Sequence, residues 1–204
     1  MTDAGASDDR DVDADSERES ESERDSLTWT TTDSAVDYAC PGFDVRVDDV
    51  RFPDGSTGQF HYVEEPAAVV VLPFTPAGDV VAIEEWRQAV GRVNRGLPVG
   101  SVEPGDDDLT VAAARELREE TGHEAERFDH LCTIEPSNGI TDSVHHYFLA
   151  WDCEPTATQD LDHNEDIRVV VADYDELLAA ARADDLQDGR TVLALTRYEL
   201  TRDD

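Results

Sequence analysis

Residues 100–122, which read GSVEPGDDDLTVAAARELREETG, join a glycine-bracketed acidic loop to a segment without a helix breaker. That segment, Leu109–Thr121, places its apolar residues near one face at helical spacing, which predicts a helix. The aspartates before it, Asp106 to Asp108, supply a cap and favourable charges for the start of the helix. Gly122 stands where a left-handed C-terminal residue is needed. The stretch therefore predicts a loop followed by one capped helix.

Three carboxylates of this predicted helix share a face, because Glu116, Glu119 and Glu120 are spaced i, i+3 and i+4. Like charges this close repel one another, so their clustering favours a hard divalent cation, which prefers oxygen ligands. In a chain this acidic, the same spacing also occurs on an ordinary solvated helix face. On spacing alone, both interpretations stand.

The order of residues in Arg115–Gly122, RELREETG, resembles the second half of the Nudix box, G-x5-E-x7-R-E-U-x-E-E-x-G-U, in which U is a bulky apolar residue. Every specified position up to the last glycine matches, which favours the cation-binding interpretation over the solvated face. The box then ends in His123 instead of an apolar residue. The resemblance implies an α/β (α+β) fold, a Nudix-type α/β/α sandwich around a mixed sheet.

The first half of the box departs from the family pattern. Counting back from Arg115, Asp107 stands at the first glutamate and Ser101 at the opening glycine, so the nearby Gly100 implies a one-residue insertion in the acidic loop. In the family the first acid braces the loop against the helix arginine. We therefore expect Asp107 to pair with Arg115, with Asp106 as the partner if the insertion falls later in the loop.

A further resemblance covers most of residues 43–200 and is closest to the ADP-ribose pyrophosphatase branch of the family. Trp86–Gln88 and Gly96–Gly100 resemble its Q-Y-R and E-L-P-A-G segments, and Ser137–Asp142 resembles its S-P-G-F-S/T-D/E loop. Gly96 stands where the branch usually has a glutamate, which removes a carboxylate from the neighbourhood of substrate and metal. The resemblance implies an enzyme that cleaves the pyrophosphate bond of a nucleoside diphosphate linked to another moiety. ADP-ribose, cut to AMP and ribose 5-phosphate, is the expected substrate.

The resemblance also implies a metal site. A diphosphate substrate is anionic, so an acidic pocket binds it only when cations reverse the local field. Glu116, Glu119 and Glu120, with the backbone carbonyl of Val99, are the expected ligands of Mg²⁺, with Mn²⁺ as the alternative ion. The bound cations would polarise phosphorus and lower the pKa of the attacking water.

Further residues are assigned to the substrate and to proton transfer. Arg87 is the expected phosphate clamp, because a guanidinium meets phosphate bidentately, although Arg87 also fits an ordinary surface strand. The resemblance makes Gly100 a substrate-binding position and Arg115 a member of the catalytic set. As proton acceptor we favour Glu165, which precedes a predicted strand, and Glu119 is its rival.

The chain divides into three predicted parts. Residues 1–26 are Asp, Glu, Ser and Arg with almost nothing apolar, so we expect a disordered acidic tail. Residues 27–65 alternate short apolar stretches with turn signals such as Pro53-Asp54-Gly55, which predicts a small antiparallel β layer. Residues 66–204 form the expected Nudix hydrolase domain. The family branch often dimerises through its N-terminal strands, so the resemblance implies a homodimer.

Within residues 66–204, the continuous apolar run Ala67–Phe74 predicts a strand that is buried on both faces. Further extended segments are expected at Asp79–Glu84, Leu97–Val102, His130–Ile134, Val144–Trp151 and Ile167–Val171, and further helices at Tyr174–Ala183 and Arg190–Leu200.

The charge balance is extreme, with 49 acidic residues against 16 basic ones, all of them Arg, and a formal net charge of −33. Such self-repulsion is nearly removed at about 1 M salt, where the Debye length falls to roughly 3 Å. The composition resembles that of proteins from salt-accumulating halophiles. An acidic surface of this kind repels nucleic acid and anionic membranes, so neither is an expected partner.

The three cysteines, Cys40, Cys132 and Cys153, are too few and too widely spaced for a disulfide framework, and their odd number fits reduced thiols in the cytoplasm. No signal peptide is visible, and the longest apolar run is far shorter than the roughly 20 residues that cross a bilayer. We therefore expect a soluble cytoplasmic protein.

Other functions remain open on the sequence. One is a Nudix enzyme for another dinucleotide or for a sugar nucleotide, because the box handles the diphosphate while loops select the rest. Another is a metabolite-sensing Nudix module that binds without turnover. The third is an acidic α/β domain without an active site, which the match to the box disfavours.

Overall fold

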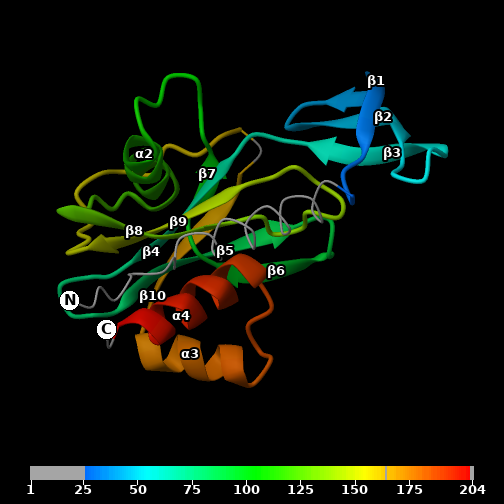
Figure 1. Cartoon of the computed structure of the whole chain (residues 1–204). Helices are drawn as coiled ribbons and strands as arrows, with labels where there is room; N and C mark the ends of the chain where they lie inside the picture. The colour runs from blue at the N-terminus through cyan, green and yellow to red at the C-terminus, as the bar shows by residue number, and fades with distance from the viewer. Residues whose placement is uncertain (1–25, 164, 203–204) are drawn as a thin grey trace, which may run out of the picture. The chain divides into compact units, whose positions relative to one another are not determined.

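The computed structural model describes residues 26–163 and 165–202 (Figure 1). Almost all of the predicted tail, residues 1–26, therefore lies outside the described residues. The chain divides into two compact units, with the boundary between Glu64 and Glu65. None of the helices in the described ranges is long and apolar enough to cross a membrane.

The first unit contains one antiparallel sheet of three strands in the order β1-β2-β3, formed by Thr30–Cys40, Phe43–Arg51 and Thr57–Glu64. The predicted hairpin turn joins β2 to β3. Its ends are held by the Phe52 N–H, which donates to the Ser56 carbonyl at 2.9 Å. Gly55 adopts φ 85°, a left-handed conformation that favours glycine. The turn residues therefore fix the register of this sheet.

The second unit contains two sheets and three helices. A mixed four-stranded sheet has the order β7-β4-β9-β8, in which β4 and β9 are parallel, and an antiparallel sheet has the order β10-β5-β6. The strands are β4 (Ala68–Pro73), β5 (Val80–Arg87), β6 (Arg92–Gly96), β7 (Val99–Ser101), β8 (Arg127–Ile134), β9 (His145–Trp151) and β10 (Ile167–Ala172), and the helices are α2 (Leu109–Thr121), α3 (Tyr174–Arg182) and α4 (Gly189–Thr201). The predicted α/β (α+β) fold with a mixed sheet is confirmed.

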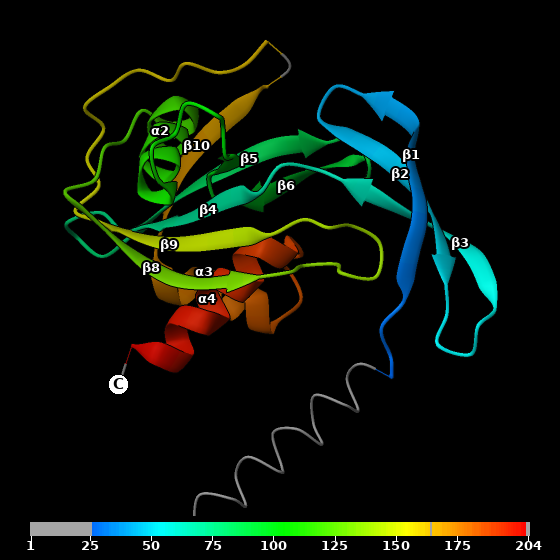
Figure 2. The same ribbon diagram turned by 45° about the horizontal axis from the view of Figure 1, so that its top comes forward.

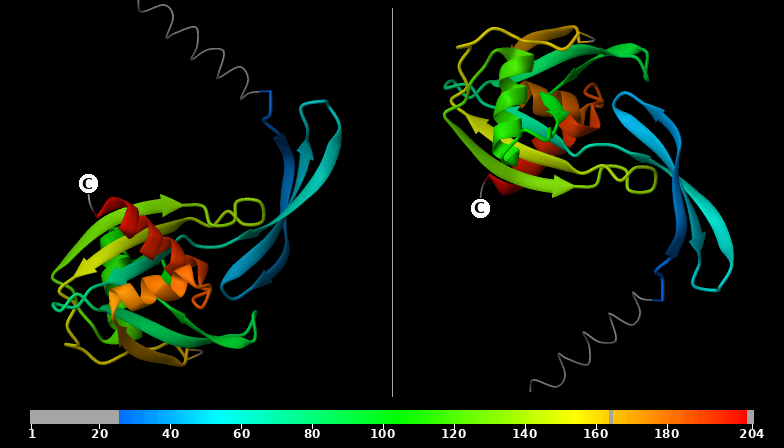
Figure 3. Two further views of the ribbon diagram at one scale, coloured as in Figure 1. Left: turned by 90° about the horizontal axis from the view of Figure 1, so that it is seen from below. Right: turned by 90° about the horizontal axis from the view of Figure 1, so that it is seen from above.

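Strand β4 carries both halves of the hydrophobic core, because successive side chains of a strand point to opposite faces. Val70 and Leu72 belong to the cluster that contains residues of α3 and α4, whereas Val69 and Val71 belong to the cluster around α2. All four side chains are at most 1% exposed. Helix α2 therefore covers one side of the sheets, and α3 and α4 cover the other (Figures 2 and 3).

Helix α2 has the bounds that the sequence predicts, Leu109–Thr121. Asp108 is its N-cap and accepts the Thr110 N–H at 2.7 Å and the Val111 N–H at 3.0 Å. Gly122 ends the helix at φ 70°, and a Cβ there would lie 2.6 Å from the Ala157 carbonyl oxygen. Both the conformation and the close neighbour require glycine, so the two ends of α2 are fixed by local chemistry.

Candidate active site

A cavity of about 420 Å³ lies where α2, β7 and the loop before β10 meet. Its polar lining joins the three carboxylates that the sequence places on α2 to acids from other segments. The lining residues are Val99, Gly100, Ser101, Glu103, Arg115, Glu116, Glu119, Glu120, Asp160, Leu161, Asp162 and Glu165. The structure thus brings together all the predicted site residues except Arg87.

Gly100 allows β7 to approach α2 closely. A Cβ added at Gly100 would lie 1.9–2.1 Å from the three carboxylate atoms of Glu116, which is closer than any real Cβ contact. The space that a side chain would fill is therefore occupied by the Glu116 carboxylate. Glycine is needed at this position to admit a carboxylate to the wall of the cavity.

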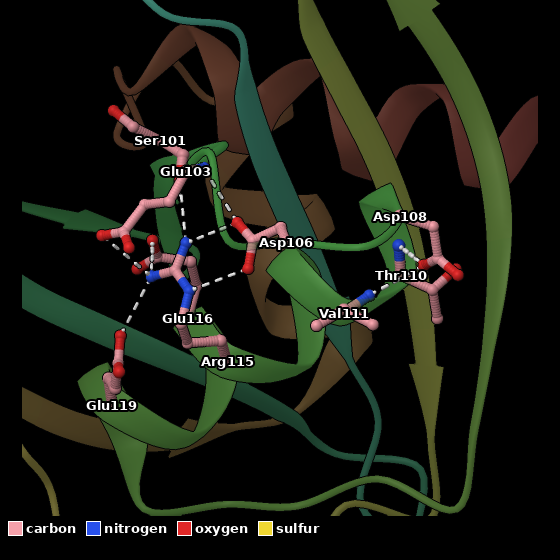
Figure 4. A network of polar contacts seen from close by, with 9 residues as sticks. All are labelled: Ser101, Glu103, Asp106, Asp108, Thr110, Val111, Arg115, Glu116 and Glu119. Carbon is pink, nitrogen blue, oxygen red and sulfur yellow. Dashed lines mark hydrogen bonds and ion pairs between the residues drawn. The ribbon is translucent and has the colours of Figure 1, made fainter.

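Arg115 is the centre of a network that ties the acidic loop to α2 (Figure 4). Its guanidinium donates to Asp106 Oδ2 at 3.0 Å and to the Ser101 carbonyl at 2.9 Å. It also donates to Glu116 Oε1 at 2.7 Å and to Glu119 Oε2 at 3.1 Å. The hydrogen bond to Asp106 is the main reason that the pKa of Arg115 is raised.

The expected Asp107–Arg115 pair is wrong, and the alternative partner, Asp106, is confirmed. The Asp106 carboxylate is oriented by the loop itself, because Oδ2 accepts the Glu103 N–H at 2.8 Å. The hydrogen bond from Arg115, followed by that from Glu103, lowers the pKa of Asp106. Asp107 is exposed. The extra residue of the loop therefore lies after the bracing acid.

Two of the α2 carboxylates are buried without a full counter-charge. Glu116 is 9% exposed and Glu120 is 4% exposed. Burial raises the pKa of Glu116 to about 7. The negative charges of Glu119 and Glu165 also raise this pKa, whereas Arg115 lowers it. Burial also raises the pKa of Glu120 to about 8, although the Val99 N–H opposes it by donating to Glu120 Oε2 at 3.0 Å. The single guanidinium of Arg115 in the lining does not balance these carboxylates, so the pocket is short of positive charge.

The chemistry of these donors fits a hard divalent cation, which would supply the missing charge. Within residues 26–163 and 165–202, no three acidic, histidine or cysteine side chains already converge as a metal-binding group. Figure 4 shows Arg115 paired with an oxygen of Glu116 and an oxygen of Glu119. One oxygen of each of these two carboxylates is therefore paired with Arg115.

The two other predicted site residues lie in different surroundings. Glu165 lines the cavity, and its Oε2 accepts the Asp162 N–H at 3.0 Å. Arg87 is not among the lining residues and pairs with Glu85 at 2.9 Å. Burial is the main reason that the pKa of Glu85 is raised, and the charge of Glu165 contributes to the rise. Arg87 thus lies beside the acidic cluster but outside the cavity.

Four acids near the cavity were not predicted from the sequence. Glu103, Asp160 and Asp162 line it, and Glu85 raises the pKa of Glu120 through its charge. Glu85 stands directly before Trp86–Gln88, the segment that resembles the family branch, and this neighbourhood could have marked it as a site residue. The other three lie in loops of a chain that is acidic throughout, so nothing in their sequence surroundings distinguishes them.

Comparisons with known proteins agree on one family. The NUDIX domain family model matches residues 64–195. A methanol dehydrogenase activator of Bacillus methanolicus is 31% identical over 157 residues, which are 76% of this chain and 84% of that protein. An ADP-ribose pyrophosphatase of Bacillus subtilis (strain 168) is 28% identical over 158 residues, which are 77% of this chain and 85% of that protein.

A solved structure shares the fold. The crystal structure of an ADP compounds hydrolase superposes with a TM-score of 0.75 at 22% identity and covers 85% of this chain and 94% of its own. The family match spans the cavity, the acidic loop and α2, whose sequence carries the second half of the Nudix box. This chain therefore belongs to the Nudix hydrolase family.

Proposed function

We propose that this protein is a Mg²⁺-dependent Nudix hydrolase that cleaves the pyrophosphate bond of ADP-ribose to give AMP and ribose 5-phosphate. One observation carries the proposal: Glu116 and Glu120 are buried in an acidic cavity in which Arg115 does not balance the negative charge, beside the glycine that admits Glu116. Relatives that are named ADP-ribose pyrophosphatases, in Bacillus subtilis and Mycobacterium tuberculosis, support this substrate.

In the proposed reaction Glu116, Glu119 and Glu120, with the carbonyl of Val99, hold Mg²⁺ or Mn²⁺. The cation polarises phosphorus and lowers the pKa of water when it is bound. Arg115 holds the α2 carboxylates and the acidic loop in register through Asp106. Gly100 leaves room for the Glu116 carboxylate in the wall of the cavity.

Glu165 is the proposed proton acceptor. It lines the cavity from the loop before β10, whereas its rival Glu119 belongs to α2 and pairs with Arg115 at 3.1 Å. The ion pair with Arg115 assigns Glu119 to the carboxylate cluster of α2. Substitution by Gln separates the two roles: Glu165→Gln should lower kcat with Mn²⁺ still bound, and Glu119→Gln should weaken cation binding. Full kcat in Glu165→Gln would overturn the assignment.

Arg87 is proposed to clamp a phosphate of the substrate outside the cation site. It pairs with Glu85, whose charge raises the pKa of Glu120 and whose own pKa is raised in part by the charge of Glu165, so the guanidinium lies close to the acidic cluster. An anionic substrate competes with Glu85 for this guanidinium. Arg87→Ala should therefore raise KM more than it lowers kcat.

We further propose that the enzyme is an intracellular homodimer from a cell rich in salt. All three cysteines are free thiols, which supports a reducing compartment. The formal charge of −33 supports a need for screening. Several large apolar side chains of the first unit, including Trp29 and Tyr38, are exposed, which supports association through its strands.

The function is tested by incubating the full chain in high KCl with Mg²⁺ and a set of candidate substrates. These are ADP-ribose, NADH, diadenosine polyphosphates, sugar nucleotides and 8-oxo-dGTP, and monophosphate or phosphate release is followed. Release of AMP from ADP-ribose is the expected result. Binding of ADP-ribose without turnover would replace the hydrolase proposal with a metabolite-sensing function.

A further inference from the structure

The segment Leu97–Val99, which joins β6 to β7, is held by hydrogen bonds from several elements. The Pro98 carbonyl accepts the Val71 N–H of β4 at 3.0 Å. The Val99 N–H donates to Glu120 Oε2 of α2, also at 3.0 Å. The position of this short segment therefore sets the position of one buried carboxylate of the proposed cation site.

A third hydrogen bond on this segment comes from α4. The Leu97 N–H donates to Thr191 Oγ1 at 3.1 Å, across 94 positions of sequence. Both residues are 1% exposed, so bulk water does not reach the N–H to replace this acceptor. A buried N–H that loses its acceptor is costly, so the hydroxyl holds Leu97 in place.

Asp188 fixes the direction of that hydroxyl. Its Oδ1 lies 2.8 Å from Thr191 Oγ1, and a carboxylate only accepts, so the hydroxyl proton points to Asp188 and a lone pair faces Leu97. As the N-cap of α4, the same Oδ1 accepts the Thr191 N–H at 2.9 Å. Burial disfavours the charged form of Asp188, but the charge of Arg190 and the hydrogen bonds from Thr191 outweigh burial and lower its pKa.

We propose that Asp188 and Thr191 are positioning residues for Glu120. The oriented hydroxyl of α4 fixes Leu97, the fixed segment places the Val99 N–H, and that N–H holds the Glu120 carboxylate toward the cavity. The inference rests on the proposed function, because it assumes that Glu120 binds a divalent cation. Its consequence is that cation affinity depends on a hydroxyl that itself contacts neither cation nor substrate.

The test is Mn²⁺ binding by the full chain in high KCl, measured as free Mn²⁺ by electron paramagnetic resonance. Thr191→Val keeps the shape of the side chain and removes the acceptor of the Leu97 N–H, and it should weaken Mn²⁺ binding by about 10- to 100-fold. In turnover assays it should raise the half-saturating Mn²⁺ concentration more than KM for the nucleotide. Thr191→Ser restores the hydroxyl and should restore most of the affinity.

A matched control lies on the same helix. The Thr196 hydroxyl is exposed and bonds to the Val192 and Leu193 carbonyls of its own helix at 2.8 and 3.1 Å. Thr196→Val makes the same chemical change without touching the segment, and it should bind Mn²⁺ as the parent chain does. Equal weakening in Thr196→Val and Thr191→Val would overturn the proposal, because it would reflect a general loss of helix stability.

The remaining outcomes separate this proposal from the proposed function. If the parent chain binds Mn²⁺ and a folded Thr191→Val variant binds it equally well, the positioning role is wrong and the hydrolase proposal stands. If the parent chain binds no divalent cation, both fail. If circular dichroism shows that Thr191→Val is unfolded, Asp188→Ala is measured instead. That variant keeps the hydroxyl but not its orientation, so weaker binding supports the role and unchanged binding overturns it.

Discussion

Replacing Gly100 with Ala is the sharpest test of the cavity geometry, because it adds one methyl group where β7 meets Glu116. The matched control is Gly96→Ala at the end of the preceding strand. A Cβ at Gly96 would lie 3.6 Å from Thr191 Oγ1 and 3.7 Å from Asp188 Cγ, which is ordinary van der Waals contact. The two variants make the same change four residues apart and differ in what the new methyl group meets.

The size of the effect follows from the distances. The added Cβ would lie 1.9 Å from the Glu116 carboxylate carbon, whereas real Cβ atoms essentially never approach closer than 3.0 Å, so the carboxylate must move by at least about 1.1 Å. The atoms in the way belong to the end of a flexible side chain, so the protein should still fold, with a free energy of unfolding lower by about 1–3 kcal/mol. A misplacement of about 1 Å in a reacting site costs about 100-fold in rate.

Gly100→Ala should therefore keep its circular dichroism spectrum and lose about 100-fold in kcat for ADP-ribose. Its Mn²⁺ affinity should fall in parallel, because Glu116 is a proposed ligand. Gly96→Ala should stay close to the parent chain in both measurements. The reasoning is refuted if Gly100→Ala turns over at the parental rate, or if both variants lose the same activity.

Three further outcomes are expected. Asp106→Ala should lower the free energy of unfolding in urea by about 1.5–3 kcal/mol, because Arg115 loses a charged partner that is largely buried. The control Asp107→Ala should change it by less than about 0.5 kcal/mol. Equal losses in the two variants would contradict the assigned pair. The pKa of Glu116 is raised to about 7 and that of Glu120 to about 8 from 4.5, so the folded metal-free chain binds protons that the unfolded chain releases. Its Tm should fall as pH rises from about 5 to 8 and recover on adding Mg²⁺ at pH 8, and a Tm that rises over this window would show that these acids are not buried as described. Stability measured against KCl should increase up to molar concentrations, and a chain most stable in dilute buffer would remove the halophile interpretation.

The parts of the fold that local chemistry sets were predictable from the sequence. Helix α2 was predicted with its bounds because its caps and its apolar spacing lie within one stretch. The strand Ala68–Pro73 was recognisable from an uninterrupted apolar run, which the structure explains by burial on both faces. In both cases the residues that determine the element are next to each other in sequence.

The parts that depend on distant partners were not predictable. Strand β6, Arg92–Gly96, has charged and exposed residues and is a strand because it pairs with β5. Counting along the box chose Asp107 over Asp106, because a count cannot place an insertion within a run of three aspartates. Asp160 and Asp162 reach the cavity only through the course of a loop, and their positions in an acidic chain give no sequence pattern that distinguishes them.

The ion pairs of Arg115 bear on how such a protein is made in the cell. A newly synthesised chain must bring several acids of α2 and the preceding loop together against their mutual repulsion. The guanidinium of Arg115 offsets part of that repulsion by pairing with carboxylates of both segments. Under the proposed function, a divalent cation would arrive at carboxylates that Arg115 has already brought together.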